Sequence, residues 1–194
     1  MNPWDSTDRA VWQAALARYP EVIARQGVAK LVERDRWYRD ELPGQIVGRE
    51  PRYMTRDELL RVVEWKMARG VWRARNLALA RTNSPETVDE ISRTALARVP
   101  DPQAPIAILS KLAGVGPATA SAVLAASAPE VYPFFDDLVA AQIPGFGAVD
   151  FTPRVYARYR DALQERARDL GEDWTATLVE RALWAASGGK AGVS

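Results

Sequence analysis

The chain of 194 residues combines 47% hydrophobic with 26% charged residues and a formal net charge of +1, which is typical of a globular protein rather than a disordered chain. The sequence contains neither cysteine nor histidine, so disulfides, thiolate- or histidine-ligated metals, iron–sulfur clusters and serine–histidine catalysis are excluded. Any chemistry must therefore come from carboxylates, lysine, tyrosine, hydroxyl or backbone groups, among which carboxylates are the best candidates.

The sequence shows no feature of a membrane or secreted protein. No apolar run approaches the ~18 residues that span a bilayer. The first dozen residues lack the basic segment and apolar core of a secretory signal. We therefore expect a cytoplasmic protein, a monomer that holds no metal and no cofactor.

Helical spacing of apolar residues extends along nearly the whole chain, and no alternating strand pattern is present. In the first half, Asp5 or Ser6 is a candidate cap, and the stretch 42–54, with two prolines and two glycines, is the first predicted loop. The helices expected before residue 104 are 7–19, a turn from Pro20 to Gly27, 28–41, 55–70, about 74–82 and 84 to about 98.

Capping signals place the remaining helices. Thr55 and Glu58 form a capping box, Ser84-Pro85 and Thr152-Pro153 are helix starts, and Gly171 ends the long helix that follows Pro153. The helices expected after residue 103 are about 104–112, about 117–128, a short one beginning at Asp136 or Asp137, 152–171 and about 174–186. The sequence thus predicts an all-α protein.

The stretch from Trp65 to Pro85 is strongly basic. It contains five cations and no acid, and it is dominated by arginine, whose planar fork matches phosphate oxygens. The alternative is a solvated helix face. As candidate DNA contacts we take Lys66, Arg69, Arg73 and Arg75.

The sequence LAGVGPATA, residues 112–120, joins two predicted helices. Gly114 and Gly116 allow positive φ and leave the backbone bare, and Pro117 suits the first turn of the second helix. We expect the N–H groups of Gly114, Gly116 and Ala118 to point outward together at a helix N-terminus, ready for a phosphate oxygen. The alternative is a plain turn between two antiparallel helices.

The longer pattern resembles the helix-hairpin-helix signature, with Gly114-Val115-Gly116 followed by Pro117, Ala118, Thr119 and an alanine-rich helix. It is similar to the helix-hairpin-helix DNA glycosylase superfamily, the relatives of endonuclease III and alkyladenine glycosylase. The resemblance covers about residues 104–142. It implies two helical lobes and backbone contacts to double-stranded DNA through residues 114–116, Ala118 and Thr119. The absence of cysteine excludes the subgroup that carries an iron–sulfur cluster.

The resemblance also implies domain boundaries. We expect a central lobe over residues 51–135, with the helix-hairpin-helix at 104–128, and a C-terminal lobe over 136–194. The helices of residues 1–50 are expected to pack with the C-terminal lobe.

In this superfamily a catalytic aspartate follows the hairpin by some twenty residues, at the start of the next helix. Here PFFDDLVAAQ supplies Asp136 and Asp137, and in alkyladenine-type members the second aspartate is catalytic, so Asp137 is favoured. The alternative role for either residue is helix capping. Bifunctional members carry a lysine where this chain has Ala118, and Lys111 is a poor substitute, so the resemblance implies a glycosylase without lyase action.

An extruded base needs a pocket with aromatic walls. The candidates are Trp65, Trp72, Phe134 and Phe135, with Trp37 and Tyr38 as further possibilities, although aromatic residues at helical spacing are more often core.

Two features depart from the superfamily. The arginine expected after the aspartate is absent, since Gln142 ends the run, and the chain is short. Three readings therefore stay open: a monofunctional DNA glycosylase acting on damaged bases, a DNA-binding relative without catalysis, and a helical module that binds protein.

Overall fold

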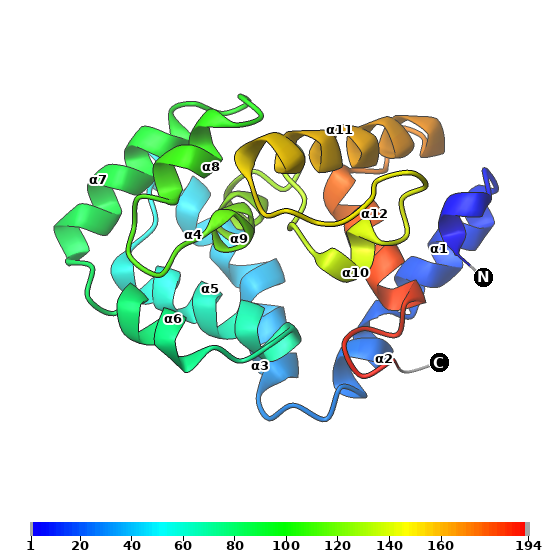
Figure 1. Cartoon of the computed structure of the whole chain (residues 1–194), viewed down its shortest axis with the longest axis horizontal. Helices are drawn as coiled ribbons and strands as arrows, with labels where there is room; N and C mark the ends of the chain where they lie inside the picture. The colour runs from blue at the N-terminus through cyan, green and yellow to red at the C-terminus, as the bar shows by residue number, and fades with distance from the viewer. Residues whose placement is uncertain (1, 193–194) are drawn as a thin grey trace.

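The computed structural model describes residues 2–192, and within that range it contains only helices and loops (Figure 1), as the sequence predicts. The elements of the first half are a 3-10 turn Pro3–Asp5, α1 Arg9–Ala17, α2 Tyr19–Ala24, α3 Leu31–Arg36, a π-helical turn Trp37–Glu41, α4 Leu42–Val47, α5 Arg56–Arg69, α6 Ala74–Ala80 and α7 Pro85–Leu96. Those of the second half are α8 Ala104–Leu109, α9 Pro117–Ser127, α10 Asp137–Ala140, α11 Pro153–Leu170 and α12 Ala176–Ala186.

The capping signals of the sequence are confirmed where they were strongest. Thr55 accepts the Glu58 N–H, and the Glu58 carboxylate accepts the Thr55 N–H, so both halves of the capping box at the start of α5 are present. Ser84 and Thr152 cap α7 and α11 through their hydroxyl groups, which accept the N–H groups of Thr87 and Val155, and each is followed by proline at the first helical position.

Two local predictions are wrong. The cap of α1 is Asp8, whose carboxylate accepts the Ala10 N–H, and neither Asp5 nor Ser6 takes this role because both belong to the end of the preceding 3-10 turn. Residues 42–47 are helix α4 instead of loop. A proline within the first turn of a helix loses no hydrogen bond, so Pro43 is compatible with this helix, and the chain leaves it only at Gly48.

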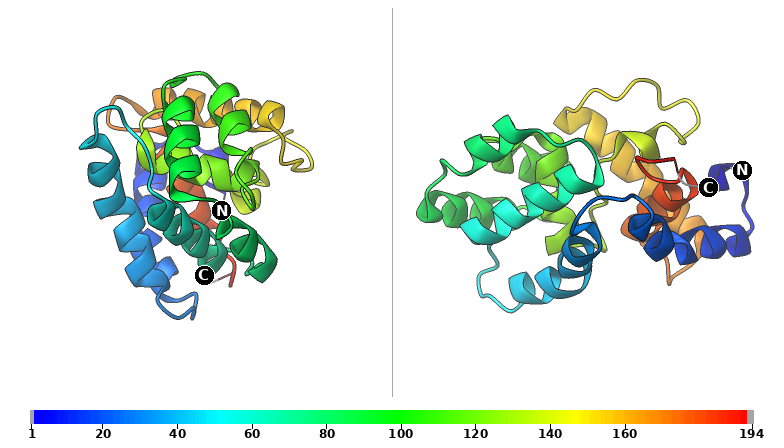
Figure 2. Two further views of the ribbon diagram at one scale, coloured as in Figure 1. Left: turned by 90° about the vertical axis from the view of Figure 1, so that its left-hand side faces the viewer. Right: turned by 90° about the horizontal axis from the view of Figure 1, so that it is seen from below.

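The helices gather into two lobes that Figure 1 and the right-hand view of Figure 2 separate clearly. Helices α3 to α9 form one lobe, in which α9 packs against α4, α5 and α8. Helices α1, α2, α10, α11 and α12 form the other, with α12 in contact with the remaining four. The first 50 residues are thus divided, because α1 and α2 pack on α12 whereas α3 packs on α5 and α4 on α9.

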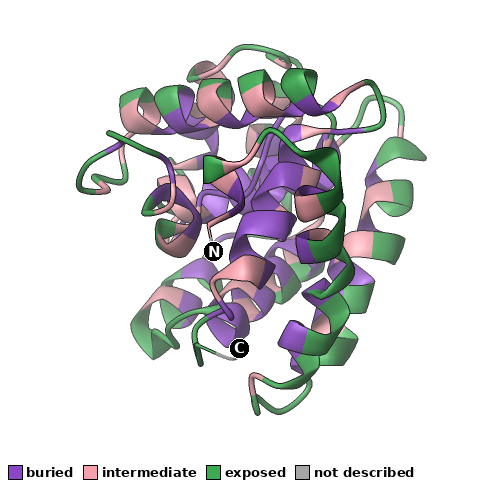
Figure 3. Ribbon diagram, turned by 90° about the vertical axis from the view of Figure 1, so that its right-hand side faces the viewer, coloured by how far each residue is buried: buried purple, intermediate pink, exposed green. Residues whose placement is uncertain are grey.

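The apolar core runs through both lobes, and exposed positions lie on the outer helix faces (Figure 3). In α9 every residue from Thr119 to Ser127 is buried, which explains its run of alanines and serines: small side chains let neighbouring helices approach closely. None of the helices within residues 2–192 is long and apolar enough to cross a bilayer.

Candidate functional site

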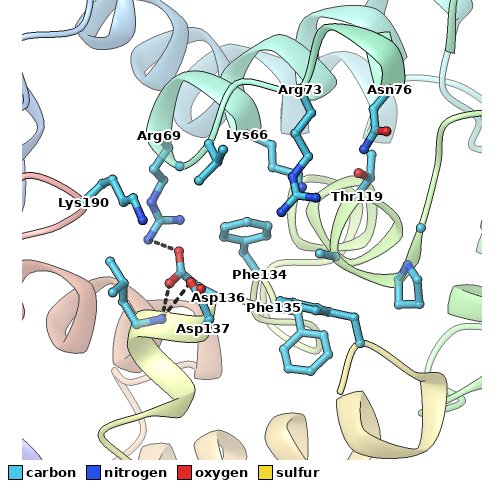
Figure 4. Close-up of a pocket in the computed structure, with 17 residues that line it drawn as sticks. Lys66, Arg69, Arg73, Asn76, Thr119, Phe134, Phe135, Asp136, Asp137 and Lys190 are labelled. Carbon is cyan, nitrogen blue, oxygen red and sulfur yellow. Dashed lines mark hydrogen bonds and ion pairs between the residues drawn. The ribbon is translucent and has the colours of Figure 1, made fainter. Parts of the chain in front are cut away.

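A cavity of about 260 Å³ opens where segments of the two lobes meet (Figure 4). Its walls come from the end of α5 and the α5–α6 loop, the start of α9, the segment leading into α10 with the start of that helix, and three isolated residues. The lining residues are Lys66, Arg69, Gly70, Val71, Arg73, Asn76, Gly116, Pro117, Ala118, Thr119, Phe134, Phe135, Asp136, Asp137, Leu138, Phe151 and Lys190.

The start of α9 contributes backbone amides to this cavity. Gly116 is the N-cap of α9, and Pro117 is its first residue. Within residues 2–192, no group accepts a hydrogen bond from the N–H of Gly116, Ala118 or Thr119. Gly116 is exposed, and a Cβ built on it meets no atom within 4 Å. The helix start therefore presents donors and its positive dipole end on an open surface.

The two other residues of the predicted contact lie elsewhere. Gly114 has φ +73°, as expected of a turn glycine, but its Cα faces the backbone of α6 and not the cavity. The Val115 side chain is buried in the core at 4% exposure. Gly116 does not use the positive φ that glycine allows, since its φ of −93° is ordinary extended backbone.

The start of α10 places both candidate carboxylates on the opposite wall. Asp136 is the N-cap of α10, and its carboxylate accepts the Leu138 N–H at 2.9 Å; the Asp137 carboxylate accepts the same N–H at 3.0 Å. The Asp136 side chain is 10% exposed, whereas Asp137 is an exposed residue. Asp136 is therefore a largely buried helix cap, whereas the Asp137 carboxylate is exposed at the cavity mouth.

Burial raises the pKa of Asp136 to about 6. The positive charge of Arg69, whose Nη2 lies 3.8 Å from the carboxylate, opposes this shift, while the negative charges of Glu180 and Asp137 add to it. At neutral pH Asp136 is therefore ionised. Burial alone would raise its pKa further, and the positive charge of Arg69 limits the rise.

Arg69 is buried beneath the acids. Its guanidinium is 1% exposed and pairs with the fully buried Glu180 at 2.5 Å, and Trp184 and Phe134 place ring faces against it at 4.5 and 5.0 Å. Although burial alone would lower its pKa, Glu180 raises it overall. The prediction of Arg69 as a DNA contact needs correction: the side chain is held inside the protein by Glu180, and it reaches the cavity only as its back wall.

The other cations of the basic stretch are divided between the cavity and the outer surface. Lys66, in the last turn of α5, and the exposed Arg73 both line the cavity, whereas Arg75 is exposed outside its wall. Burial and, to a smaller extent, the charge of Arg73 lower the pKa of Lys66. Lys190 extends into the cavity from the segment after α12 (Figure 4), and nothing in the sequence around it indicated this position.

The aromatic candidates are divided between the cavity wall and the protein core. Phe134 and Phe135 line the cavity. Trp65 does not: it is fully buried, stacked on Tyr38 at 3.6 Å, and its indole N–H donates to Asp35. It supports the cavity only indirectly, through its edge contact with Phe134 at 5.2 Å.

The remaining aromatic residues lie outside the cavity or were missed by sequence reasoning. Trp72 is 51% exposed on the α5–α6 loop, outside the cavity wall, and Trp37 is a buried residue of the π-helical turn. Phe151 lines the cavity and contacts Phe135 at 4.9 Å between ring centroids.

No family model matches the chain, and no curated protein or solved structure matches it either. Function must therefore be inferred from the cavity residues.

The cavity walls offer two kinds of chemistry, anion binding and the action of a carboxylate. Free amides and the cations Lys66, Arg73 and Lys190 can bind oxygen atoms that carry negative charge. The carboxylate of Asp137 can stabilise a developing positive charge or orient a water molecule. Sequence reasoning found the acids, the amides and Lys66. It missed the lining residues Asn76, Phe151 and Lys190 and the buried Glu180 that pairs with Arg69, because only the tertiary fold brings them to the site.

Proposed function

We propose that the protein binds double-stranded DNA and hydrolyses the N-glycosidic bond of a damaged base, as a helix-hairpin-helix DNA glycosylase without an iron–sulfur cluster. One observation supports this most directly: the unpaired amides at the start of α9, the Asp136–Asp137 pair and the cations of the α5–α6 segment line the same cavity. Hydrolysis of a nucleoside in DNA needs phosphate binding, a base pocket and a carboxylate together, and this cavity combines free amides and cations, aromatic side chains and carboxylates from distant parts of the chain.

Phosphate binding is assigned to the amides of Gly116, Ala118 and Thr119 together with Lys66 and Arg73. Backbone N–H groups at a helix start bind phosphate without reading sequence, and nearby cations add affinity that weakens with salt. Arg75, exposed in the first turn of α6, extends the same basic surface beyond the cavity.

The base pocket is assigned to the space beside Phe134 and Phe135. A volume of about 260 Å³ lies just below the ~300 Å³ at which pockets for drug-sized ligands begin, so it suits a single extruded base. Val71 and Trp72, each 51% exposed on the α5–α6 loop, form an apolar tip beside it. An exposed tip of this kind is suited to fill the gap that an extruded base leaves in the stack.

The carboxylate of Asp137 is assigned the chemical step. Loss of a base leaves positive charge on the sugar, and an ionised carboxylate below the ring stabilises that charge and orients the attacking water. Asp137 is exposed at the cavity wall, at the N-terminus of α10. Hydrolysis of this type needs no cofactor.

The test is a panel of duplexes, each carrying one deaminated, oxidised or alkylated base, with release of the free base measured by chromatography. We expect release of at least one lesion, loss of that release in Asp137→Asn, and unchanged affinity of this variant for the same duplex. The matched control is Asp173→Asn, a substitution at an exposed acid that lies outside the cavity. Wild-type activity in Asp137→Asn would refute the catalytic assignment.

A DNA-binding protein without catalysis is separated by the same experiment. In that case the duplexes bind with an affinity that falls steeply with salt, because neutralised phosphates release counterions, but no base is released. A protein-binding module gives neither result. Removing Lys66 or Arg73 singly is expected to reduce the slope of log affinity against log salt by about one phosphate contact.

A further inference from the structure

We propose that the protein has a second binding site, which takes a carboxylate group in a pocket between α3 and α5. This α3–α5 pocket has a volume of about 160 Å³ and shares no lining residue with the cavity described above. It is lined by Lys30, Glu33, Arg34, Trp37, Arg61 and Glu64. The proposal goes beyond the proposed function and does not depend on it, since neither DNA nor the Asp136–Asp137 pair takes part.

Helical spacing brings the lining side chains of the α3–α5 pocket together. Residues 30, 33, 34 and 37 follow one another at intervals of three or four and so form one stripe along α3 and the turn after it. Residues 61 and 64 form the matching stripe on α5, and α3 packs against α5. The pocket therefore lies at the edge of a helix–helix contact, where charged side chains of both helices meet.

An unpaired hydrogen-bond donor lies in the wall of this pocket. Trp37 is 2% exposed, and no group in the part of the chain that the structure describes accepts a hydrogen bond from its indole N–H. Buried polar groups in folded proteins nearly always have a partner, so this donor calls for one from outside the chain. Because an indole nitrogen can only donate, the missing partner must be an acceptor.

The cations of the pocket favour an acceptor that carries negative charge. The Arg61 guanidinium lies 3.7 Å from the centre of the Trp37 ring, the same ring that carries the unpaired N–H. Within residues 2–192, neither Arg61 nor Lys30 forms an ion pair, whereas Arg34 pairs with Glu64 at 3.4 Å. Two of the three cations in the pocket thus have charge that no acid of the described chain neutralises.

The balance of charge favours a carboxylate over a phosphate dianion. Glu64 is shared between its partner in the pocket and Arg81 outside it, at 3.9 Å, and Glu33 is exposed at the rim. Three cations and two acids among the lining residues leave a net charge of +1, which a single carboxylate neutralises. Its two oxygen atoms can accept hydrogen bonds from the Trp37 N–H and from the Arg61 guanidinium at the same time.

The experiment follows the indole N–H signals of the ¹⁵N-labelled full chain by NMR at pH 7. The Trp37 signal is assigned by through-bond experiments and checked by its absence from Trp37→Phe. We expect acetate to shift this signal downfield until the site is saturated, whereas chloride at the same ionic strength leaves it in place, since both salts screen charges equally.

Two arginine variants separate the pocket from general charge effects. Arg61→Gln should weaken acetate binding about tenfold or more, the effect of losing one hydrogen bond to a charged group. The matched control is Arg98→Gln, at an exposed arginine outside the pocket, which should bind acetate as the wild type does.

Two peptide probes identify the source of the carboxylate. The capped tripeptides acetyl-Ala-Glu-Ala-amide and acetyl-Ala-Gln-Ala-amide differ in the charge of the central side chain. A shift of the Trp37 signal with the glutamate peptide alone assigns the site to an acidic side chain of a protein partner. A shift with acetate and with neither peptide assigns it to a small free carboxylate.

Three results would overturn the proposal. The Trp37 signal responds to acetate no more than to chloride, which leaves water as the partner of its N–H; inorganic phosphate shifts the signal at a lower concentration than acetate does; or folded Arg61→Gln binds acetate as tightly as the wild type. None of these results bears on base release, which the panel of lesion duplexes measures separately.

Discussion

Gly114 lies so close to Asn76 that a Cβ at position 114 would come within 2.4 Å of the Asn76 carbonyl oxygen. The turn before α9 is thereby docked on the backbone of α6. Asn83 completes the contact, since its side chain accepts the Ala113 N–H and donates to the Ala113 carbonyl oxygen. The amides at the start of α9 are thus fixed relative to Arg73, the N-cap of α6, and to Lys66 in the last turn of α5.

This docking predicts opposite outcomes for the two glycines of the turn. Gly114→Ala should lower the free energy of unfolding by about 2 to 4 kcal/mol, because a methyl group meets backbone atoms at a φ of +73° that L-residues rarely adopt. Gly116→Ala should leave stability nearly unchanged, since its φ is ordinary and its surroundings are open, but it should weaken DNA binding by covering the amides. Urea denaturation and a duplex-binding titration measure the two effects, and equal stability of both variants would show that the turn does not dock on α6.

The pair of Arg69 and Glu180 predicts a large loss of stability on neutralisation of the acid. Glu180 is fully buried and accepts hydrogen bonds from Arg69 and, at 3.5 Å, from Arg39. Glu180→Gln removes the charge that both guanidinium groups face and should lower the free energy of unfolding by about 3 to 5 kcal/mol. The exposed pair of Arg9 and Asp173 is the control, and Asp173→Asn should change stability by less than about 1 kcal/mol. Similar losses in the two variants would contradict this account.

Much of the fold could be predicted because its signals are local. A capping box involves residues three apart, as at Thr55 and Glu58, and proline at a helix start acts on its own backbone. Where a local rule permits two outcomes, prediction failed: Pro43 fits a loop or a helix start, and only the packing of α4 against α9 decides between them.

The candidate site could be predicted in part for the same reason. Asp136 and Asp137 follow the glycine turn in a recognisable pattern, but whether an arginine binds phosphate or a buried carboxylate depends on a partner far along the chain. Arg69 and Glu180 are 111 residues apart, and Lys190 reaches the cavity from the far end of the described chain. No local sequence pattern encodes contacts between residues so far apart in the chain.

Asp136 predicts how stability changes with pH. Its pKa of about 6 in the folded protein exceeds its ordinary value of 3.8, so the native state binds this proton more tightly than the unfolded chain does. The stabilisation is fully present below about pH 4, and it is lost as the pH rises through about 6.

In Asp136→Asn, which keeps a capping side chain but cannot titrate, this dependence disappears. We therefore expect the free energy of unfolding of the wild type to fall relative to that of the variant by up to about 3 kcal/mol between pH 4 and pH 8. Urea denaturation of both proteins across this range measures the difference. Because acids elsewhere contribute equally to both proteins, a difference that stays constant with pH would show that Asp136 titrates normally and that its burial at the cavity wall has no electrostatic consequence.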